Sequence, residues 1–244
     1  MGGGRAPGVI TLLVGSGSVA GQRQPVSEAE AHHLRVRRAS AGDEVGLRDG
    51  AGLVGTGRLA SVGREWVVEV ARLEHRPRPA PLWLAVGAGD RERFGWLAEK
   101  AAELGATDLV PLETERTAGV ASRVRAGQVE RLQRQALEAI KQCGAAWAPV
   151  VHPPESLARF LARAAAGHRW LADAVGPPPP TALDHSPVTV IVGPEGGLTQ
   201  AEQELVLGAG YRTVGLAPAI LRFETAALAA AAAVTTARLR GQHG

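Results

Sequence analysis

The chain has 244 residues, enough for one large domain or for a small domain joined to a medium one. It is 45% hydrophobic and 21% charged, as is ordinary for a globular protein, and its net charge of +3 permits a nucleic-acid partner without demanding one. The single cysteine, Cys143, excludes a disulfide framework and a thiolate metal cluster. No signal-peptide pattern is visible, and the most apolar run, residues 226–234, is too short to span a bilayer, so we expect a cytoplasmic protein with no membrane partner.

The first 76 residues predict a small β-rich module. A capping box, Ser27 with Glu30, begins a short helix, and Asp49-Gly50 is a typical hairpin turn. The glycines of residues 15–21 imitate a dinucleotide-binding fingerprint, but Pro25 leaves no room for the helix that it requires, so we reject a nicotinamide dehydrogenase. The strands of the module are expected over residues 9–14, 44–48, 53–61 and 66–73.

Basic residues gather at the end of this predicted helix. They are His33, Arg35, Arg37 and Arg38, and the guanidinium fork of arginine suits phosphate. They are therefore candidate contacts to a nucleic acid. A solvated helix face is the alternative interpretation for the arginines, and packing or capping at the helix end is the alternative for the histidine.

A proline-rich connection, residues 76–81, separates this module from a longer region, and we place the domain boundary after residue 76. From there strands and helices alternate, which predicts a parallel sheet covered by helices on both sides. The expected strands are residues 82–86, 109–112, 169–172, 188–192 and 211–216. The expected helices are residues 90–104, 128–143 and 156–166, one that begins at about residue 200, and a last one that ends at about Arg240.

Two loops at the ends of consecutive strands have the composition of ligand-binding loops. Residues 188–192 are typical of a strand buried on both faces; the loop Gly193–Gly197 ends it, and Thr199 with Glu202 then forms a capping box. A second loop, residues 217–226, follows the next strand. Ligands bind outside the carboxyl ends of such strands, where bare backbone can approach them. A tight turn without a ligand is the alternative.

The two loops resemble the signature of a known family. Val192-Gly-Pro-Glu-Gly-Gly-Leu-Thr199 and Leu216-Ala-Pro-Ala-Ile-Leu-Arg-Phe-Glu-Thr-Ala226 are similar to the paired motif of the RsmE-type 16S ribosomal RNA (uracil-N3)-methyltransferases, which belong to the SPOUT superfamily. The stretch from His32 to Gly50 is similar to the PUA-like N-terminal domain of that family, and residues 90–144 follow its pattern in part.

The resemblance implies a fold, a function and partners. The implied fold is an α/β SPOUT-type parallel sheet with a C-terminal trefoil knot over residues 77–244, preceded by a small PUA-like β-barrel domain over residues 1–76. In that family the PUA-like domain helps to hold RNA, so the four basic residues above are the expected RNA contacts. The implied methyl donor is S-adenosylmethionine, the acceptor is N3 of a uridine in 16S ribosomal RNA, and the protein is expected to be a homodimer.

Three loops are expected to bind this donor. The bare backbone of the glycine loop can reach the adenine and ribose, the second loop would form the opposite wall, and the end of strand 169–172 would supply the third loop. Carboxylates nearby would favour the positive sulfonium. The predicted donor-binding residues are Leu171, Ala172, Asp173, Val192, Gly193, Pro194, Glu195, Gly196, Gly197, Leu216, Ala217, Pro218, Ala219, Ile220 and Leu221.

Two residues of the second loop are candidates for catalysis. Uracil N3 is a poor nucleophile until its proton leaves, so methyl transfer needs a base or donors that stabilise negative charge on the carbonyl oxygens. Arg222 is the candidate for that stabilisation or for gripping the phosphate of the target, and Glu224 is the candidate base. The alternative role of Glu224 is to stabilise the first turn of the last helix. No metal site is expected, because the adjacent pair His32-His33 lacks further identifiable ligands.

The sequence departs from the family pattern at three places. Gly87-Ala88-Gly89 stands before Asp90 where relatives usually carry Lys-Gly, so a basic contact is missing at Gly89. Ala145 stands where relatives commonly carry arginine, and the N-terminal region has only Arg5 and no aromatic residue. These departures keep a non-catalytic RNA-binding protein as an alternative, against which the glycine-rich loops argue. Another SPOUT enzyme, acting on ribose 2′-hydroxyls or on tRNA, is the second alternative, and the N-terminal module argues against it.

Overall fold

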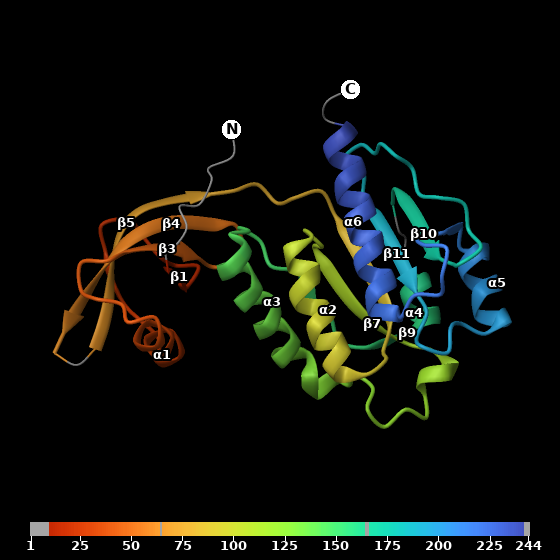
Figure 1. The fold of residues 1–244 in the computed structure, drawn as a ribbon, viewed down its shortest axis with the longest axis horizontal. Helices are drawn as coiled ribbons and strands as arrows, with labels where there is room; N and C mark the ends of the chain where they lie inside the picture. The colour runs from red at the N-terminus through yellow and green to blue at the C-terminus, as the bar shows by residue number, and fades with distance from the viewer. Residues whose placement is uncertain (1–9, 64, 164–165, 242–244) are drawn as a thin grey trace. The chain divides into compact units, whose positions relative to one another are not determined.

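The computed structural model describes residues 10–63, 65–163 and 166–241 (Figure 1). Contacts between residues divide the chain into two compact units. The first unit contains the residues up to Arg78 together with Ile140–Trp147, and the second contains Pro79–Ala139 with the residues from Ala148 onward. The predicted boundary after residue 76 lies close to this division, but the sequence did not indicate that Ile140–Trp147 packs with the N-terminal residues.

The first unit is a five-stranded sheet with one helix. Its strand order is β1-β3-β4-β5-β2, in which β1 runs parallel to β3 and the other pairs are antiparallel. The helix α1 (Glu28–Val36) begins at Ser27, whose hydroxyl accepts a hydrogen bond from the Glu30 amide as the capping pattern predicts. The strands are β1 (Ile10–Leu13), β2 (Arg23–Pro25), β3 (Glu44–Arg48), β4 (Leu53–Val62) and β5 (Glu65–His75). The core of the unit consists of Leu12, Leu34, Val45, Leu47, Leu59, Val68 and Val70.

The segment Ile140–Trp147 completes this unit. The indole nitrogen of Trp147 donates to the Arg76 carbonyl at 3.1 Å, and its ring meets His75 edge-on with 5.7 Å between centroids. A Cβ at Gly52, where φ is +107°, would lie 2.6 Å from the Trp147 ring. A glycine is therefore required where the hairpin passes under the tryptophan.

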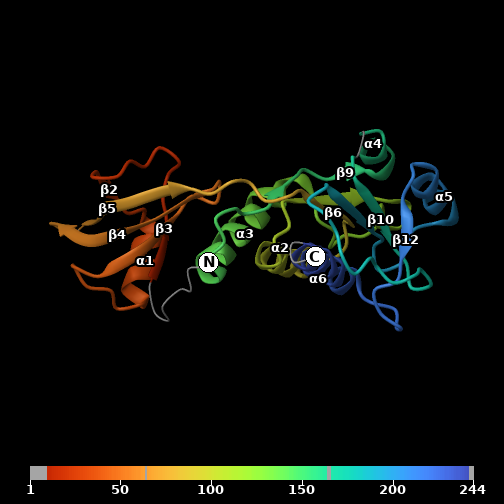
Figure 2. The ribbon, with the colours of Figure 1, turned by 90° about the horizontal axis from the view of Figure 1, so that it is seen from above.

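The second unit is a parallel sheet with helices on both faces (Figures 1 and 2). Its strand order is β12-β10-β11-β6-β7-β8, and the short β9 pairs with β7 beyond the end of β8. The strands are β6 (Leu82–Gly87), β7 (Asp108–Glu113), β8 (Val150–Val151), β9 (Glu155–Ser156), β10 (His168–Ala172), β11 (Val188–Val192) and β12 (Arg212–Val214). The helices are α2 (Arg91–Glu103), α3 (Val129–Cys143), α4 (Leu157–Leu161), α5 (Gln200–Gly208) and α6 (Phe223–Gly241). The residues of α3 from Ile140 onward belong to the first unit.

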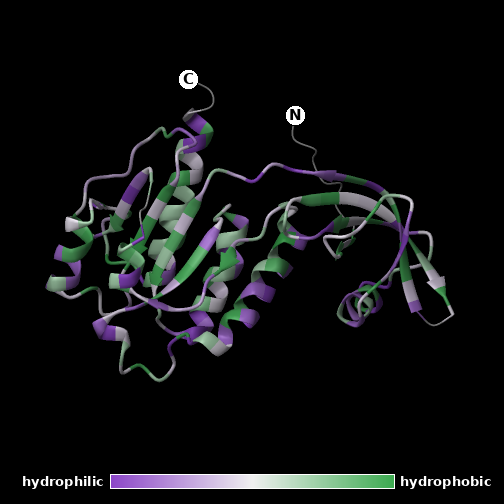
Figure 3. Ribbon diagram, turned by 180° about the vertical axis from the view of Figure 1, so that it is seen from behind, coloured by the Kyte–Doolittle hydropathy of each residue, from purple (hydrophilic) through white to green (hydrophobic). Residues whose placement is uncertain are grey.

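Alternate residues of the central strands supply two cores. Leu84 and Val86 of β6 pack with α2 and α6, whereas Ala85 between them packs with α4 and α5. Every residue of β11 is buried, as its unbroken apolar sequence predicts. The hydrophobic colour of these central strands is visible in Figure 3.

Some predicted elements are shorter than expected, and others were missed. Helix α4 ends at Leu161 rather than near residue 166, and β12 ends at Val214 rather than at residue 216. The strands β2, β8 and β9 have only two or three residues each, too few to show an alternating pattern. Two short 3-10 helices, Glu115–Thr117 and Ala126–Gln128, were not predicted either.

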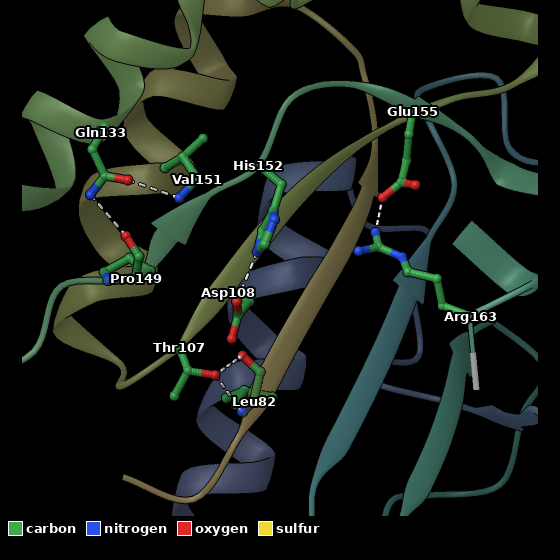
Figure 4. A network of polar contacts seen from close by, with 9 residues as sticks. All are labelled: Leu82, Thr107, Asp108, Gln133, Pro149, Val151, His152, Glu155 and Arg163. Carbon is green, nitrogen blue, oxygen red and sulfur yellow. Dashed lines mark hydrogen bonds and ion pairs between the residues drawn. The ribbon is translucent and has the colours of Figure 1, made fainter. Parts of the chain in front are cut away.

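The outer edge of the sheet is closed by side-chain hydrogen bonds (Figure 4). The Gln133 amide of α3 donates to the Pro149 carbonyl at 3.0 Å and accepts from the Val151 amide at 2.9 Å, so it bonds β8 much as another strand would. His152 lies 2.8 Å from the buried carboxylate of Asp108. These contacts bind backbone groups of the edge strand that could otherwise pair with a strand of another molecule.

The last helix lies against both the sheet and the connection from β10 to β11. It contacts β6, β10 and β11, and the Leu183 amide of that connection donates to the Ala237 carbonyl at 3.0 Å. The Arg238 guanidinium donates to the carbonyls of Ala80, Pro81 and Ser186 at 2.8–2.9 Å. The C-terminal helix is therefore held by segments that come from widely separated parts of the chain.

Candidate functional site

The glycine loop turns sharply at the end of the buried strand β11. The Gly197 amide donates to the Pro194 carbonyl at 2.7 Å, and Gly197 has a φ of +72° that favours glycine. Thr199 then caps α5: its hydroxyl accepts from the Glu202 amide, and the Glu202 carboxylate accepts from the Thr199 amide at 2.9 Å. The predicted capping box is therefore present, and it fixes where the loop ends.

Two further loops meet at the carboxyl ends of β10 and β12. The Asp173 amide donates to the Val214 carbonyl at 3.0 Å, and the Gly215 amide donates to the Pro177 carbonyl at 2.8 Å. A Cβ at Gly215 would lie 2.3 Å from the Gly176 carbonyl oxygen, so the two backbones touch. Because the strands are parallel, all three loops lie at the same edge of the sheet.

The three loops enclose a cavity of about 400 Å³. Its wall contains every predicted donor-binding residue except Pro218, which lies in the same loop but does not line the cavity. The wall also contains six residues that are not among the predicted donor-binding residues: Arg116, Ala174, Leu198, Gln203, Phe223 and Ala226. Arg116 follows the carboxyl end of β7 in the same sheet, and that position was the one available signal for it.

The two predicted catalytic residues lie beside the cavity rather than in its wall. Leu221 and Phe223 line it, but Arg222 between them is exposed and Glu224 is buried at 7% exposure. The Glu224 Oε1 atom lies 3.8 Å from Arg93 Nη1 of α2. Its Oε2 atom is buried and has no hydrogen-bond partner among the described residues.

A carboxylate of the glycine loop reaches the start of α2. The Asp90 amide lies 3.4 Å from Glu195 Oε1, and a Cβ at Gly89 would lie 2.7 Å from Glu195 Oε2. Asp90 caps α2, and hydrogen bonds from the backbone amides of Arg93 and Glu92 hold the pKa of its carboxyl below the ordinary value. Ala88 is fully buried.

The basic residues predicted to bind RNA lie at the end of α1 in the first unit. Arg35, Arg37 and Arg38 are exposed, and His33 is half-buried. Arg38 has a φ of +54°, so it ends the helix in the left-handed conformation. Three guanidinium groups are thus available to solvent on one short stretch of chain.

Comparison with known proteins identifies the family. The RNA methyltransferase domain matches residues 76–235, and the PUA domain of RNA methyltransferases matches residues 26–70. The chain belongs to the RsmE-type RNA methyltransferases. The ribosomal RNA small subunit methyltransferase E of Synechocystis is 30% identical over 220 residues, which cover 86% of this chain and 71% of that protein. The enzyme of the same name from Bacillus subtilis is 29% identical, covering 88% and 91%.

Solved structures of similar methyltransferases have the same fold. A methyltransferase from Legionella pneumophila in complex with S-adenosylmethionine superposes with a TM-score of 0.82 at 27% identity, covering 94% of this chain and 97% of that one. Ribosomal RNA small subunit methyltransferase E from Neisseria gonorrhoeae, bound to S-adenosylmethionine, gives 0.81 at 26% identity, covering 94% and 98%. The expected α/β parallel sheet that follows a PUA-like domain is therefore confirmed.

The part of the chain that the structure describes has neither a metal cluster nor a membrane-spanning helix. Within the described residues, no group of three or more His, Cys, Asp or Glu side chains could hold a metal ion. None of the helices in that part of the chain is long and apolar enough to cross a membrane.

Proposed function

We propose that this protein transfers a methyl group from S-adenosylmethionine to N3 of one uridine in 16S ribosomal RNA. The observation that carries the proposal is the cavity between the loops after β10, β11 and β12, in a chain whose relatives hold S-adenosylmethionine. The substrate follows from the relatives named ribosomal RNA small subunit methyltransferase E.

The wall of the cavity fits this donor. Its wall includes the five residues of the glycine loop and apolar residues such as Leu171, Leu216 and Phe223, which suit an adenine ring. A Cβ at Gly193 would lie 3.1 Å from the Leu198 amide nitrogen, so a side chain there would push the two parts of the loop slightly apart. When bound, the donor supplies an electrophilic methyl group on a sulfonium.

Two carboxylates of the wall suit that positive charge. Asp173 and Glu195 belong to different loops and both line the cavity. Glu195 is held in place from α2, since its carboxylate lies over Gly89 and beside the Asp90 amide. These two side chains would orient the sulfonium electrostatically, without touching the reacting atoms.

Arg222 is proposed to act on the acceptor. Its side chain is exposed directly beside the cavity residue Leu221, at the start of α6. A guanidinium there would stabilise negative charge on a uracil carbonyl oxygen after N3 loses its proton, or grip a phosphate of the target. Replacement by alanine should lower turnover or RNA affinity; normal values of both would remove Arg222 from the site.

Glu224 is proposed to accept the N3 proton. Its buried Oε2 has no partner among the described residues and so keeps an acceptor oxygen, although the carboxylate faces Arg93 and does not line the cavity. Its position in the first turn of α6 equally suits helix stabilisation. The variant Glu224→Gln separates the two roles: undiminished methylation with unchanged donor affinity would assign Glu224 to the helix alone.

The biological setting follows from the same proposal. The exposed arginines of α1 are proposed contacts to the phosphates of ribosomal RNA. The protein is proposed to act in the cytoplasm as a homodimer, and Trp96 of α2, 47% exposed, is a large apolar side chain that a second copy could cover. Light scattering of the purified protein tests the dimer.

The function is tested in two steps. Calorimetric titration with S-adenosylmethionine, with NADH as the control ligand, tests the donor site. The protein is then added to small ribosomal subunits from a strain that lacks this methylation, and the RNA is digested and analysed by mass spectrometry. The proposal expects 3-methyluridine at one position; a methyl group on ribose, or none, would refute it.

A further inference from the structure

Arg116 is the only cation among the described residues that line the cavity. It lies in the short 3-10 helix Glu115–Thr117 after β7, and its Nη1 atom donates to the carbonyl of Gly196 in the glycine loop. Its Cδ atom would be 3.2 Å from a Cβ at Gly196, so the aliphatic stem packs on the loop. The residue as a whole is exposed, so the guanidinium reaches the cavity from its open side.

The turn that carries Arg116 is fixed by a buried carboxylate. Glu202, 6% exposed, accepts a hydrogen bond from the Glu115 amide at 2.8 Å through Oε1 and from the Thr199 amide at 2.9 Å through Oε2. The same side chain therefore bonds the start of the Arg116 turn and the start of α5 after the glycine loop. The Thr114 amide also donates to the Thr117 hydroxyl at 2.9 Å across the turn. These hydrogen bonds fix the backbone of the Arg116 turn relative to the start of α5.

Arg116 forms no ion pair with a described residue, although two carboxylates line the same cavity. A guanidinium offers five N–H donors, and the Gly196 carbonyl needs one or two of them. The other charged groups of the described cavity wall are the carboxylates Asp173 and Glu195, which suit a positive sulfonium. A cation beside them would repel a sulfonium, so its free donors are suited to an anion.

We infer that Arg116 binds an oxyanion that enters this cavity with the substrates, either the α-carboxylate of the donor or a phosphate of the acceptor RNA. The inference rests on the proposed function, because that function supplies both oxyanions. The planar fork of arginine fits carboxylate and phosphate alike in a two-bonded geometry. Arg116 is thus a binding residue of the site, in addition to supporting the glycine loop.

Three variants separate binding of the oxyanion from support of the loop. Arg116→Gln keeps an amide that can donate to the Gly196 carbonyl but removes the charge, Arg116→Lys keeps the charge without the fork, and Arg116→Ala removes both. Arg134→Ala, at an exposed position of α3 in the same unit, is the matched control. Each protein is titrated with S-adenosylmethionine, with decarboxylated S-adenosylmethionine, and with 16S ribosomal RNA at several salt concentrations.

If Arg116 binds the donor carboxylate, Arg116→Gln should lower the affinity for S-adenosylmethionine by roughly 10-fold or more, as expected for a lost charged hydrogen bond. The affinity for decarboxylated S-adenosylmethionine should stay unchanged. Binding of a phosphate predicts unchanged affinity for both donors, weaker RNA binding, and a salt dependence reduced by about one unit of slope. In either case Arg116→Lys should retain more affinity than Arg116→Gln.

Two results would overturn the inference alone. If Arg116→Gln binds all three ligands like the wild type, Arg116 binds no oxyanion. If Arg116→Ala lowers the affinity for both donors equally and Arg116→Gln binds both like the wild type, Arg116 only positions the loop through Gly196. A wild-type protein that binds no S-adenosylmethionine and methylates no RNA would instead refute the proposed function, and this inference with it.

Discussion

Replacing Gly87 with alanine tests whether the neighbouring strand sets the position of the glycine loop. Gly87 is the buried last residue of β6, and a Cβ there would lie 2.4 Å from the Pro194 nitrogen and 2.8 Å from its Cα. Backbone atoms cannot rotate away as the end of a flexible side chain can, so either β6 or the loop must move. Overpacking of this kind costs about 1–3 kcal/mol.

Part of this free energy should appear as weaker donor binding, because Pro194 lines the cavity. If the loop moves and binding restores it, 1–3 kcal/mol corresponds to an affinity that is roughly 5- to 150-fold lower. The melting temperature should fall by about 2–12 °C, at about 2–4 °C per kcal/mol for a chain of this size. Calorimetry with S-adenosylmethionine and thermal unfolding followed by circular dichroism measure the two effects.

The control is Gly127→Ala, in the same unit. No atom lies within 4 Å of a Cβ at Gly127, so this change should leave donor affinity and melting temperature nearly unchanged. If Gly87→Ala binds the donor as tightly as Gly127→Ala does, the position of Pro194 does not determine binding, and the close-packing argument for this loop is wrong.

Three further predictions concern stability and RNA contact. Burial raises the pKa of Tyr211 to about 12, so the stability that the protonated phenol contributes is present below pH 10 and is lost as the pH rises toward 12. Over that range the wild type should lose roughly 2 kcal/mol more unfolding free energy than Tyr211→Phe, and parallel curves would contradict this. The Lys141 ammonium lies 2.8 Å from the carboxylate of Glu30, which is 4% exposed. Lys141→Met should therefore lower the free energy of unfolding in urea by about 3–5 kcal/mol, because it leaves a buried carboxylate unpaired. Adding Glu30→Met should recover most of this loss, and no recovery would argue against a coupled pair. Arg38 has a φ of +54°, so Arg38→Gly should raise the unfolding free energy by about 1 kcal/mol. The same change should weaken RNA binding, and unchanged RNA affinity would remove Arg38 from the proposed contact surface.

The sequence predicted elements whose signals are local. Ser27, Asp90 and Thr199 each mark a helix start, because a capping side chain bonds an amide two or three residues away along the chain. The strand β11 was equally clear, since a strand buried on both faces needs an unbroken apolar run. The cavity could be anticipated for the same reason: three loops that follow neighbouring parallel strands must lie at one edge.

Contacts between distant residues left no such signal. Lys141 and Glu30 are 111 positions apart, and nothing in either neighbourhood shows that their side chains meet. Likewise the strands β8 and β9 depend on pairing with β7 rather than on their own two-residue sequences. For the same reason, no local pattern indicates that Ile140–Trp147 packs with the residues up to Arg78.

Arg116 shows how such a residue can still be found. Arg116 follows β7, and β6 lies between β7 and β11 in the sheet. The glycine loop after β11 can therefore reach Arg116 only if the end of β6 leaves room for it. Gly87 and Gly89 leave that room: Pro194 occupies the space of the first missing side chain, and the Glu195 carboxylate occupies that of the second. The glycine loop thus extends over the end of β6, and Gly196 comes within hydrogen-bond reach of Arg116. Glycines at the end of a central parallel strand therefore indicate that the loops on either side meet above it, and charged residues in those loops are candidates for the site.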